Sequence, residues 1–286
     1  MLEFPRQRLA DLLGHEPRGW VRRGGGYTDA GRWVVELAQN RLVFVKAASG
    51  PGAEAVRREA SVLGSLSGFF HPRLLAFGDE ADLAIEVIED LSSALWPPPY
   101  PEEVNALFDA LDELEDHDPP LGLRELQRPS EPVWPLLGAD RGWLQNQAVC
   151  TDAWLDASID AVASAEEEFD PSGNRLVHND LWSGNIAFVG RRCLFIDWAE
   201  AHRGSHWVDM GFAMLSLRSE GDPAQIRAFP GDAAFACWWS AQLIRRLTDG
   251  VEPWLDATIV EGLRQDLAAV LAWASELLDL PTPGHE

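Results

Sequence analysis

Side chains that favour a hard metal ion recur between residues 176 and 197. Asp180 lies within the segment LVHNDLWSGN, Asn185 ends it, and Asp197 ends the segment RCLFID. Two short β-type runs, residues 186–189 and 193–196, are joined by the turn Gly190-Arg191, which predicts a hairpin. A hairpin returns Asn185 towards Asp197, so one amide and two carboxylates converge. Mg²⁺ that bridges phosphates takes one or two carboxylates from a protein, and the pattern therefore predicts a Mg²⁺–phosphate site.

A single lysine provides the second chemical signal. Lys46 is the only lysine beside 22 arginines, and it follows the apolar run of residues 42–45. An ammonium is a compact point charge, whereas the arginine fork is broad and planar, so this position favours a function that arginine does not serve. On this residue alone, an arginine-rich compositional bias explains the lysine equally well.

The spacing H-x-D-x-x-x-x-N from His178 to Asn185 is the catalytic-loop pattern of the protein-kinase fold. A strand-borne lysine lies upstream, and the strand-borne Asp197 follows Asn185 by 12 residues. In this order the chain resembles the aminoglycoside phosphotransferase-like family, the small-molecule branch of that fold. The resemblance runs from about Trp20 to Asp209, and the last 75 residues match only in being helical.

The resemblance implies a role for each matching residue. Lys46 corresponds to the lysine that holds the α- and β-phosphates of a nucleotide, and Glu59 to its ion-pair partner on a helix. Asp180 corresponds to the catalytic base, which together with Lys46 makes the catalytic pair. Where the family usually has glycine between the His and the Asp, this chain has Asn179, which also tolerates a left-handed backbone.

The remaining roles are metal binding and support. By the same resemblance, Asn185 and Asp197 are the metal ligands and His178 positions the loop. Asp209, in a Gly-x-x-x-x-Asp stretch that begins at Gly204, braces the loop and is therefore structural. The co-substrates implied are Mg²⁺ and ATP or GTP.

Strand patterns upstream predict the sheet that presents Lys46. Residues 20–23, 32–37, 42–47, 74–77 and 84–91 have strand composition and predict a five-stranded sheet, preceded by a short helix within residues 1–15. A helix over residues 53–66 places Glu59 beside its apolar stripe, so that Glu59 leans towards Lys46. Glu54 is the other candidate partner.

Two further segments are candidates for nucleotide contact. Glycines let backbone N–H groups approach an anion, so Gly25, Gly26 and Thr28 are predicted to cover the phosphates. A glycine run between strands is, taken alone, more typical of a flexible hairpin. Backbone groups from Glu89 to Leu91, at the end of the fifth strand, are predicted to bind the adenine edge.

The fold class predicted is α+β, a two-lobed protein-kinase-like fold. The N-lobe, residues 1–91, holds a five-stranded antiparallel sheet plus a helix. The C-lobe, residues 92–286, follows a stiff proline run and is mainly helical, with a short catalytic hairpin. Five tryptophans of the C-lobe, residues 134, 143, 154, 238 and 239, either pack in the core or help to cup an amine through stacking.

Composition excludes several partners. The chain has a formal charge of −23 and a pI near 4.6, which argues against nucleic acid and anionic membranes and weakly favours cationic small molecules. Three cysteines without metal or redox spacing fit a reducing compartment. No signal peptide and no apolar run of membrane-spanning length are present, so a cytoplasmic protein is expected.

The function predicted is transfer of the γ-phosphate of ATP or GTP to a hydroxyl of a small, amine-bearing molecule, such as an aminoglycoside, another antibiotic or an amino-sugar. A protein kinase is a weaker alternative, because only 11 residues separate Asp197 from Asp209 and no Ala-Pro-Glu motif follows. A nucleotide-binding pseudokinase or scaffold without transfer is also open. A metal-dependent hydrolase using His178, His202 and His206 is the third alternative. His202 and His206 have the spacing H-x-x-x-H, although Gly204 between them does not favour a zinc-binding helix.

Overall fold

The computed structural model describes residues 2–24, 29–80, 82–98, 100–102, 104–139, 142–221, 223–248 and 257–284. Internal contacts divide the chain into two compact units. The first unit contains Met1–Arg124 and Asn174–Arg203, and the second contains Glu125–Gly173 and Gly204–Glu286. The lobe boundary after residue 91 stays a prediction.

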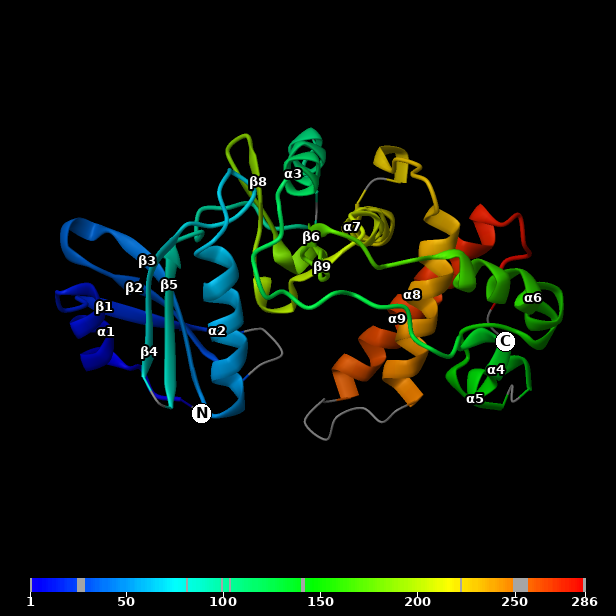
Figure 1. Cartoon of the computed structure of the whole chain (residues 1–286), viewed down its shortest axis with the longest axis horizontal. Coiled ribbons are helices and arrows are strands. Elements are labelled where there is room, and N and C mark those ends of the chain that lie inside the picture. Colours follow the sequence, from blue (N-terminus) through cyan, green and yellow to red (C-terminus); the bar gives the residue numbers. More distant parts are fainter. Residues whose placement is uncertain are drawn as a thin grey trace. The chain divides into compact units, whose positions relative to one another are not determined.

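The first unit is built on a five-stranded antiparallel sheet with strand order β1-β2-β3-β5-β4 (Figure 1). This confirms the predicted sheet. Because β5 stops at Glu89, it is two residues shorter at this end than expected. The strands are β1 Gly19–Arg23, β2 Gly31–Glu36, β3 Leu42–Ser49, β4 Leu74–Glu80 and β5 Leu83–Glu89.

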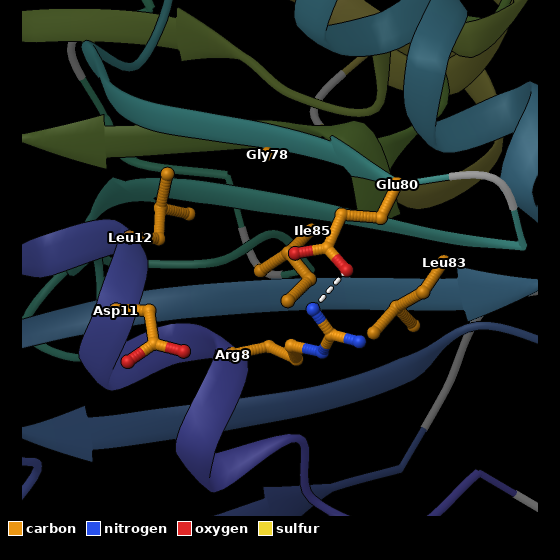
Figure 2. Close-up of a pocket in the computed structure, with 7 residues that line it drawn as sticks. All are labelled: Arg8, Asp11, Leu12, Gly78, Glu80, Leu83 and Ile85. Atoms are coloured by element: carbon orange, nitrogen blue, oxygen red, sulfur yellow. Dashed lines mark ion pairs between the residues drawn. The ribbon is translucent and has the colours of Figure 1, made fainter.

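Helix α1, Arg6–Leu13, lies on one face of this sheet. A pocket of about 270 Å³ lies where α1 meets β4 and β5 (Figure 2). Arg8 of α1 forms an ion pair with Glu80 of β4 in this pocket, and Leu12, Leu83 and other residues line it. None of the predicted site residues lines the pocket.

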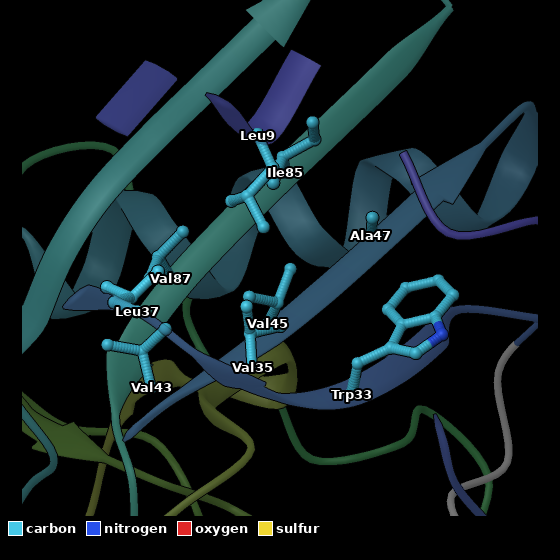
Figure 3. Packing of buried hydrophobic residues seen from close by; sticks show 9 residues of the cluster. All are labelled: Leu9, Trp33, Val35, Leu37, Val43, Val45, Ala47, Ile85 and Val87. Atoms are coloured by element: carbon cyan, nitrogen blue, oxygen red, sulfur yellow. The ribbon is translucent and has the colours of Figure 1, made fainter. Parts of the chain in front are cut away.

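The same face holds an apolar core. Alternate residues of the strands point to it, as the two-residue period of a strand requires, and Leu9 of α1 packs against them (Figure 3). Burial of this layer ties α1 to the sheet. The strand residues are Trp33, Val35, Leu37, Val43, Val45, Ala47, Ile85 and Val87.

Helix α2, Pro51–Leu63, covers the opposite face. Proline at its first position suits a helix start, because that residue needs no N–H partner. The small side chains of Ala48 and Ala84 let Ala53 and Val56 of α2 approach the strands closely. The helix ends at Leu63, three residues before the predicted end.

The rest of the first unit carries the predicted catalytic segment. The hairpin β7–β8 is a two-stranded sheet, and β6 pairs with β9 in another. The elements are 3₁₀ helix η1 Ala38–Asn40, α3 Asn105–Glu115, β6 Arg175–Val177, η2 Ser183–Asn185, β7 Ile186–Val189, β8 Arg192–Phe195, η3 Trp198–Glu200 and β9 His202–Gly204.

Helices are the main secondary structure among the described residues of the second unit. The tail, which resembles the family only in being helical, contains α8 and α9. Among the described residues, no helix is long and apolar enough to cross a membrane. The elements are α4 Trp134–Ala139, α5 Gly142–Gln147, α6 Asp152–Glu168, α7 Trp207–Glu220, η4 Pro223–Gln225, α8 Asp232–Thr248 and α9 Ala257–Leu277.

The tryptophans of this unit belong mainly to its core. Trp134, Trp154, Trp238 and Trp239 are buried. The indole N–H of Trp134 donates to Ser240 Oγ at 2.9 Å, and that of Trp154 donates to a serine of α9 at 3.0 Å. Buried indoles with their polar atom satisfied are ordinary packing, which favours the core interpretation of Trp134 and Trp154 over the stacking one. For Trp238 and Trp239 the core interpretation rests on burial.

Candidate active site

The hairpin brings together the residues that the sequence separates. Ile186 pairs with Phe195 and Val189 with Arg192, and Gly190 takes the positive φ of 62° that the tight turn requires. The pairing continues past the strands, since the Ile196 N–H donates to the Asn185 carbonyl at 2.9 Å. Asp197 is the next residue, so the predicted return of Asn185 towards Asp197 is confirmed.

The loop before the hairpin is held by Asn185. The side-chain amide nitrogen of Asn185 donates to the Asp180 carbonyl at 2.8 Å and to Asp180 Oδ2 at 2.9 Å. The first bond holds the backbone of the loop, and the second fixes the direction of the Asp180 carboxylate. Asn179 has φ of 66°, which confirms that asparagine adopts the left-handed backbone in place of glycine.

His178 links this loop to the far strand of the hairpin. Its side chain is fully buried, and Nε2 donates to the Ile196 carbonyl at 2.9 Å. Burial lowers the pKa of His178 to about 4, although the Ile196 carbonyl favours the charged ring. The imidazole is therefore neutral at pH 7, with its proton on Nε2. A neutral, buried ring that ties two segments together supports a positioning role rather than proton transfer.

Lys46 joins two carboxylates that are distant in sequence. The ammonium forms an ion pair with Glu59 of α2 and another with Asp197 Oδ1 at 3.0 Å. Lys46 is 7% exposed and Glu59 is 2% exposed, whereas the Asp197 side chain is 35% exposed. The predicted Lys46–Glu59 pair is thus present, and Lys46 also connects the sheet with the hairpin.

The charges of this trio favour an anion-binding ammonium. Burial alone would lower the pKa of Lys46, but the carboxylates of Glu59 and Asp197 outweigh it and raise that pKa above its usual value. Burial opposes ionisation of Asp197, yet the nearby ammonium lowers the pKa of that carboxyl below its usual value. Lys46 and Asp197 are therefore both charged at pH 7.

The other candidate partner of Lys46 is excluded. Glu54 lies in the first turn of α2 with an exposed side chain, where Arg57 approaches it at 3.7 Å. The neighbouring Arg58 donates from Nε to the Ala199 carbonyl at 3.1 Å. This bond connects the helix that carries Glu59 with the segment directly after Asp197, a link that nothing in the sequence pattern indicated.

Glu86 is the acidic residue that sequence reasoning missed. It lies on β5 directly opposite Lys46 and is 1% exposed. Its strand reads Ala-Ile-Glu-Val-Ile, and a charged residue in the middle of a buried run was the available signal. Lys46 thus has three carboxyl groups around it rather than one or two.

The donor set suits Mg²⁺. The amide nitrogen of Asn185 is bonded to Asp180, so its carbonyl oxygen lies on the other side of the amide group and is directed away from those bonds. Asp197 is ionised, and its side chain is partly accessible to solvent. One carboxylate and one amide oxygen are the few hard ligands that Mg²⁺ takes from a protein when phosphates and water complete its shell.

The nucleotide-contact predictions have different outcomes. Gly25, Gly26 and Thr28 lie outside the described residues. Glu89 ends β5, and its carboxylate accepts the Arg73 N–H at 2.8 Å. The Leu91 carbonyl accepts the Ala94 N–H at 2.9 Å. Adenine binding at Glu89 and Leu91 stays a prediction.

Asp209 lies in the second unit. It occupies the first turn of α7 and is 2% exposed. A buried carboxylate near a helix N-terminus is stabilised by the helix dipole, which suits a structural residue. Its predicted bracing of the catalytic loop stays a prediction.

The sequence model of the phosphotransferase enzyme family matches residues 19–244. The match covers the sheet, the Lys46–Glu59 pair, the catalytic loop and the hairpin. The chain belongs to the phosphotransferase enzyme family. The resemblance seen in the sequence is thereby confirmed, and the chain is a phosphotransferase. The metal-dependent hydrolase alternative is wrong, and no group of three or more His, Cys, Asp or Glu side chains that could hold a metal occurs in the described part of the chain.

Solved structures show the fold of this phosphotransferase. A thermostable mutant of aminoglycoside phosphotransferase APH(4)-Ia is 15% identical, with a TM-score of 0.57 over 93% of this chain and 97% of that chain. A choline/ethanolamine kinase family protein from Mesorhizobium loti is 17% identical, with a TM-score of 0.57 over 96% of both chains. Macrolide 2'-phosphotransferase MphH from Brachybacterium faecium is 15% identical, with a TM-score of 0.58 over 91% of this chain and 95% of that chain. The kinase-like α+β fold is therefore confirmed. A search of curated proteins finds no match.

Proposed function

We propose that this phosphotransferase moves the γ-phosphoryl group of ATP or GTP to a hydroxyl of a small, amine-bearing molecule. The observation that carries the proposal is the placement of Lys46. Its ammonium links Glu59 of α2 with Asp197 of the hairpin, and Asn185 of the same hairpin orients the Asp180 carboxylate. The proposed phosphate-binding cation, metal ligands and base all belong to the first unit.

The charged residues serve to bind and hold the triphosphate. Lys46 would neutralise the phosphate oxygens, because Glu59 and Asp197 keep its ammonium charged and directed. Asn185 and Asp197 would hold Mg²⁺, which supplies positive charge to the phosphate oxygens. Phosphoryl transfer depends mainly on positioning and charge neutralisation, so these contacts are expected to account for most of the catalysis.

Asp180 would orient the acceptor hydroxyl and take its proton. A general base must be aimed at the proton that it removes, and the hydrogen bond from Asn185 fixes one oxygen of the Asp180 carboxylate. The same asparagine would thus contribute to both metal binding and base orientation. This coupling explains why the two residues lie five positions apart in a short loop.

Charge supports a cationic acceptor. Residues 125–173 and 204–286, which form the second unit, contain 7 arginines and 22 acidic residues, a formal charge of −15. The first unit contains 16 basic and 24 acidic residues, a formal charge of −8. An acidic surface raises the local concentration of cations and steers cationic ligands towards the protein. One solved neighbour is a ternary complex of an aminoglycoside phosphotransferase with ADP and hygromycin B, which also supports an amine-bearing acceptor.

The other two alternatives have less support. A pseudokinase usually lacks the lysine or a metal ligand, whereas Lys46, Asn185 and Asp197 are all present here. A protein kinase requires a long peptide-binding segment after the metal aspartate. Here Asp197 is followed at once by η3, and β9 ends at Gly204.

Product release with a panel of acceptors tests the proposal. We expect ADP or GDP release that requires an added hydroxylated amine, an antibiotic or an amino-sugar. Asp180→Asn should lower turnover by about 10² to 10⁴, the usual contribution of a positioned base. Asparagine keeps an oxygen that accepts the bond from Asn185, so the loop should be retained. Asp109→Asn, on the exposed face of α3, is the matched control and should turn over like the wild type.

Two outcomes would contradict the proposal. Turnover by Asp180→Asn near the wild-type rate would show that Asp180 is not the base. Nucleotide binding without release for any acceptor would favour the pseudokinase.

A further inference from the structure

A row of ionisable residues crosses the sheet beneath α2. Arg32 of β2 lies opposite Lys46 of β3, and Lys46 lies opposite Glu86 of β5. Residues directly opposed in antiparallel strands share a face, so the three side chains project to the same side. That side is the one covered by α2, from which Glu59 approaches Lys46.

Glu86 is in an environment that does not suit a carboxylate ion. It is 1% exposed, and no donor group in the described part of the chain bonds to either carboxyl oxygen. A side-chain hydrogen bond with the Glu59 carboxyl favours the protonated form of Glu86. Phe77 of β4 lies opposite it on the other side. A buried carboxylate without donors loses its hydration with little in return, whereas the neutral acid is far less costly to bury.

Electrostatic interactions with neighbouring groups lead to the same protonation state. Burial raises the pKa of Glu86 well above its usual value, the like charge of Glu59 raises it further, and Lys46 opposes both. Burial also raises the pKa of Glu59, but its ion pair with Lys46 makes Glu59 the ionised member of the two. The groups that face Glu86 are therefore Lys46 and Glu59, with Asp197 and Arg32 further along the cluster.

The formal charges of this cluster sum to zero when Glu86 is left out. Lys46 and Arg32 carry two positive charges, and Glu59 and Asp197 carry two negative ones. Arg32 lowers the pKa of both those carboxyls, which places its charge in the same field. An ionised Glu86 would leave the cluster with one net negative charge beside the ammonium that must attract a triphosphate.

We propose that Glu86 is a positioning residue of the nucleotide site, held as a neutral carboxylic acid beside Lys46, and that the triphosphate binds most tightly while Glu86 keeps its proton. The inference rests on the proposed function, because it takes Lys46 to be the phosphate-binding cation. The neutral acid fills the space beside the Lys46 stem without competing for its charge. Loss of the proton gives Glu86 a negative charge. This charge repels the triphosphate and attracts the Lys46 ammonium towards β5.

The test is the affinity of the full chain for Mg·ATP, measured by calorimetry between pH 7.5 and 10. At pH 7.5 the triphosphate is ionised, and Lys46 stays charged across the range. We expect the affinity of the wild type for Mg·ATP to fall about tenfold or more as Glu86 ionises. This is the effect of a negative charge within about 10 Å of the triphosphate at an effective dielectric near 20. The affinity of Glu86→Gln for Mg·ATP should equal that of the wild type at pH 7.5 and should change less than about threefold by pH 10.

Glu54→Gln is the matched control, since it removes an exposed carboxylate from the adjacent helix and should follow the wild-type curve. Parallel affinity curves for the wild type and Glu86→Gln, over a pH range in which carbon-13 NMR shows the buried glutamate losing its proton, would overturn the inference. A large loss of affinity in Glu86→Gln at pH 7.5 would also overturn it, because Glu86 would then act as an ion. Wild-type protein that binds no nucleotide at any pH would overturn the proposed function too, which separates the two failures.

A second measurement needs no variant. Carbon-13 NMR of glutamate carboxyl groups in the wild type should show a buried glutamate that is still protonated at pH 7.5. A spectrum in which every glutamate is ionised at that pH would contradict the inference, whether or not Glu86→Gln folds.

Discussion

Replacing Lys46 with methionine tests whether the ion pairs of this residue stabilise the first unit. Methionine keeps the length and apolar character of the stem and removes the charge. Glu59 and Asp197 would then face each other without the cation that separates them. The side chains of Lys46 and Glu59 are 8% and 3% exposed, so water cannot replace the lost partner at Glu59.

The expected loss of stability follows from geometry. At the 3.0 Å between Lys46 Nζ and Asp197 Oδ1, with an effective dielectric near 20, the attraction is about 5 kcal/mol before desolvation. Asp197 is partly exposed, so solvent screening reduces its share. Removing one member of a buried pair costs about 3 to 5 kcal/mol, and we expect about 3 kcal/mol here, mainly from Glu59.

Urea unfolding at pH 7.5 and at pH 5 measures this loss and identifies its cause. Without the ammonium, the pKa values of Glu59 and Asp197 in the folded state rise. A raised carboxyl pKa gives stability that is present at low pH and is lost as pH rises through the folded pKa. The penalty of Lys46→Met should therefore be smaller at pH 5 than at pH 7.5.

Arg57→Met is the control for this experiment. It removes a cation from the exposed pair with Asp79 and should cost less than about 1 kcal/mol. A Lys46→Met variant within about 0.5 kcal/mol of the wild type would refute the reasoning, since changes that small are typical of surface substitutions. A penalty independent of pH would refute the electrostatic cause.

Three further outcomes are expected. Asn185→Ala should raise the Mg²⁺ concentration for half-maximal activity by roughly 10- to 100-fold, and an unchanged Mg²⁺ titration would contradict its assignment as a ligand. Because burial lowers the pKa of His178 from 6.5 to about 4, wild-type stability should fall by about 3 kcal/mol as pH drops from 6.5 through 4, and His178→Gln should flatten that part of the urea-unfolding profile. Arg58→Ala removes the bond to the Ala199 carbonyl, which contributes about 1 kcal/mol, and should therefore lower kcat/KM about fivefold. Equal effects of Arg58→Ala and Arg57→Ala on kcat/KM would contradict a role for this bond.

The parts of the fold that were predictable are those that local pattern determines. Strand alternation and the turn residues Gly190-Arg191 are local, so the five-stranded sheet and the hairpin followed from them. The position at which a helix ends is determined less by the local sequence. The end of α2 at Leu63 depends on packing, which a periodic pattern does not contain.

The site was predictable where chemistry restricts residue type. Few residues could replace Asp197 in its proposed role of metal ligand or Lys46 as a point charge, so residue type and order together marked them as candidates. Glu86 was missed because its partner lies on a neighbouring strand, 40 positions away, and strand register is a tertiary property. Arg58 was missed because a surface arginine on a helix has no sequence feature that marks a bond to the Ala199 carbonyl.

The row of residues across the sheet gives a reason for the single lysine. Lys46 forms ion pairs with Glu59 and with Asp197, and in the proposed function it also binds a phosphate. An ammonium directs three donors around one atom, whereas a guanidinium places its donors in a plane. Arg32 already occupies the next position in the row, and its guanidinium is turned back to the Ala30 carbonyl at 2.9 Å. The chain therefore keeps arginine where a fixed charge is sufficient and uses lysine where one cation must reach several partners.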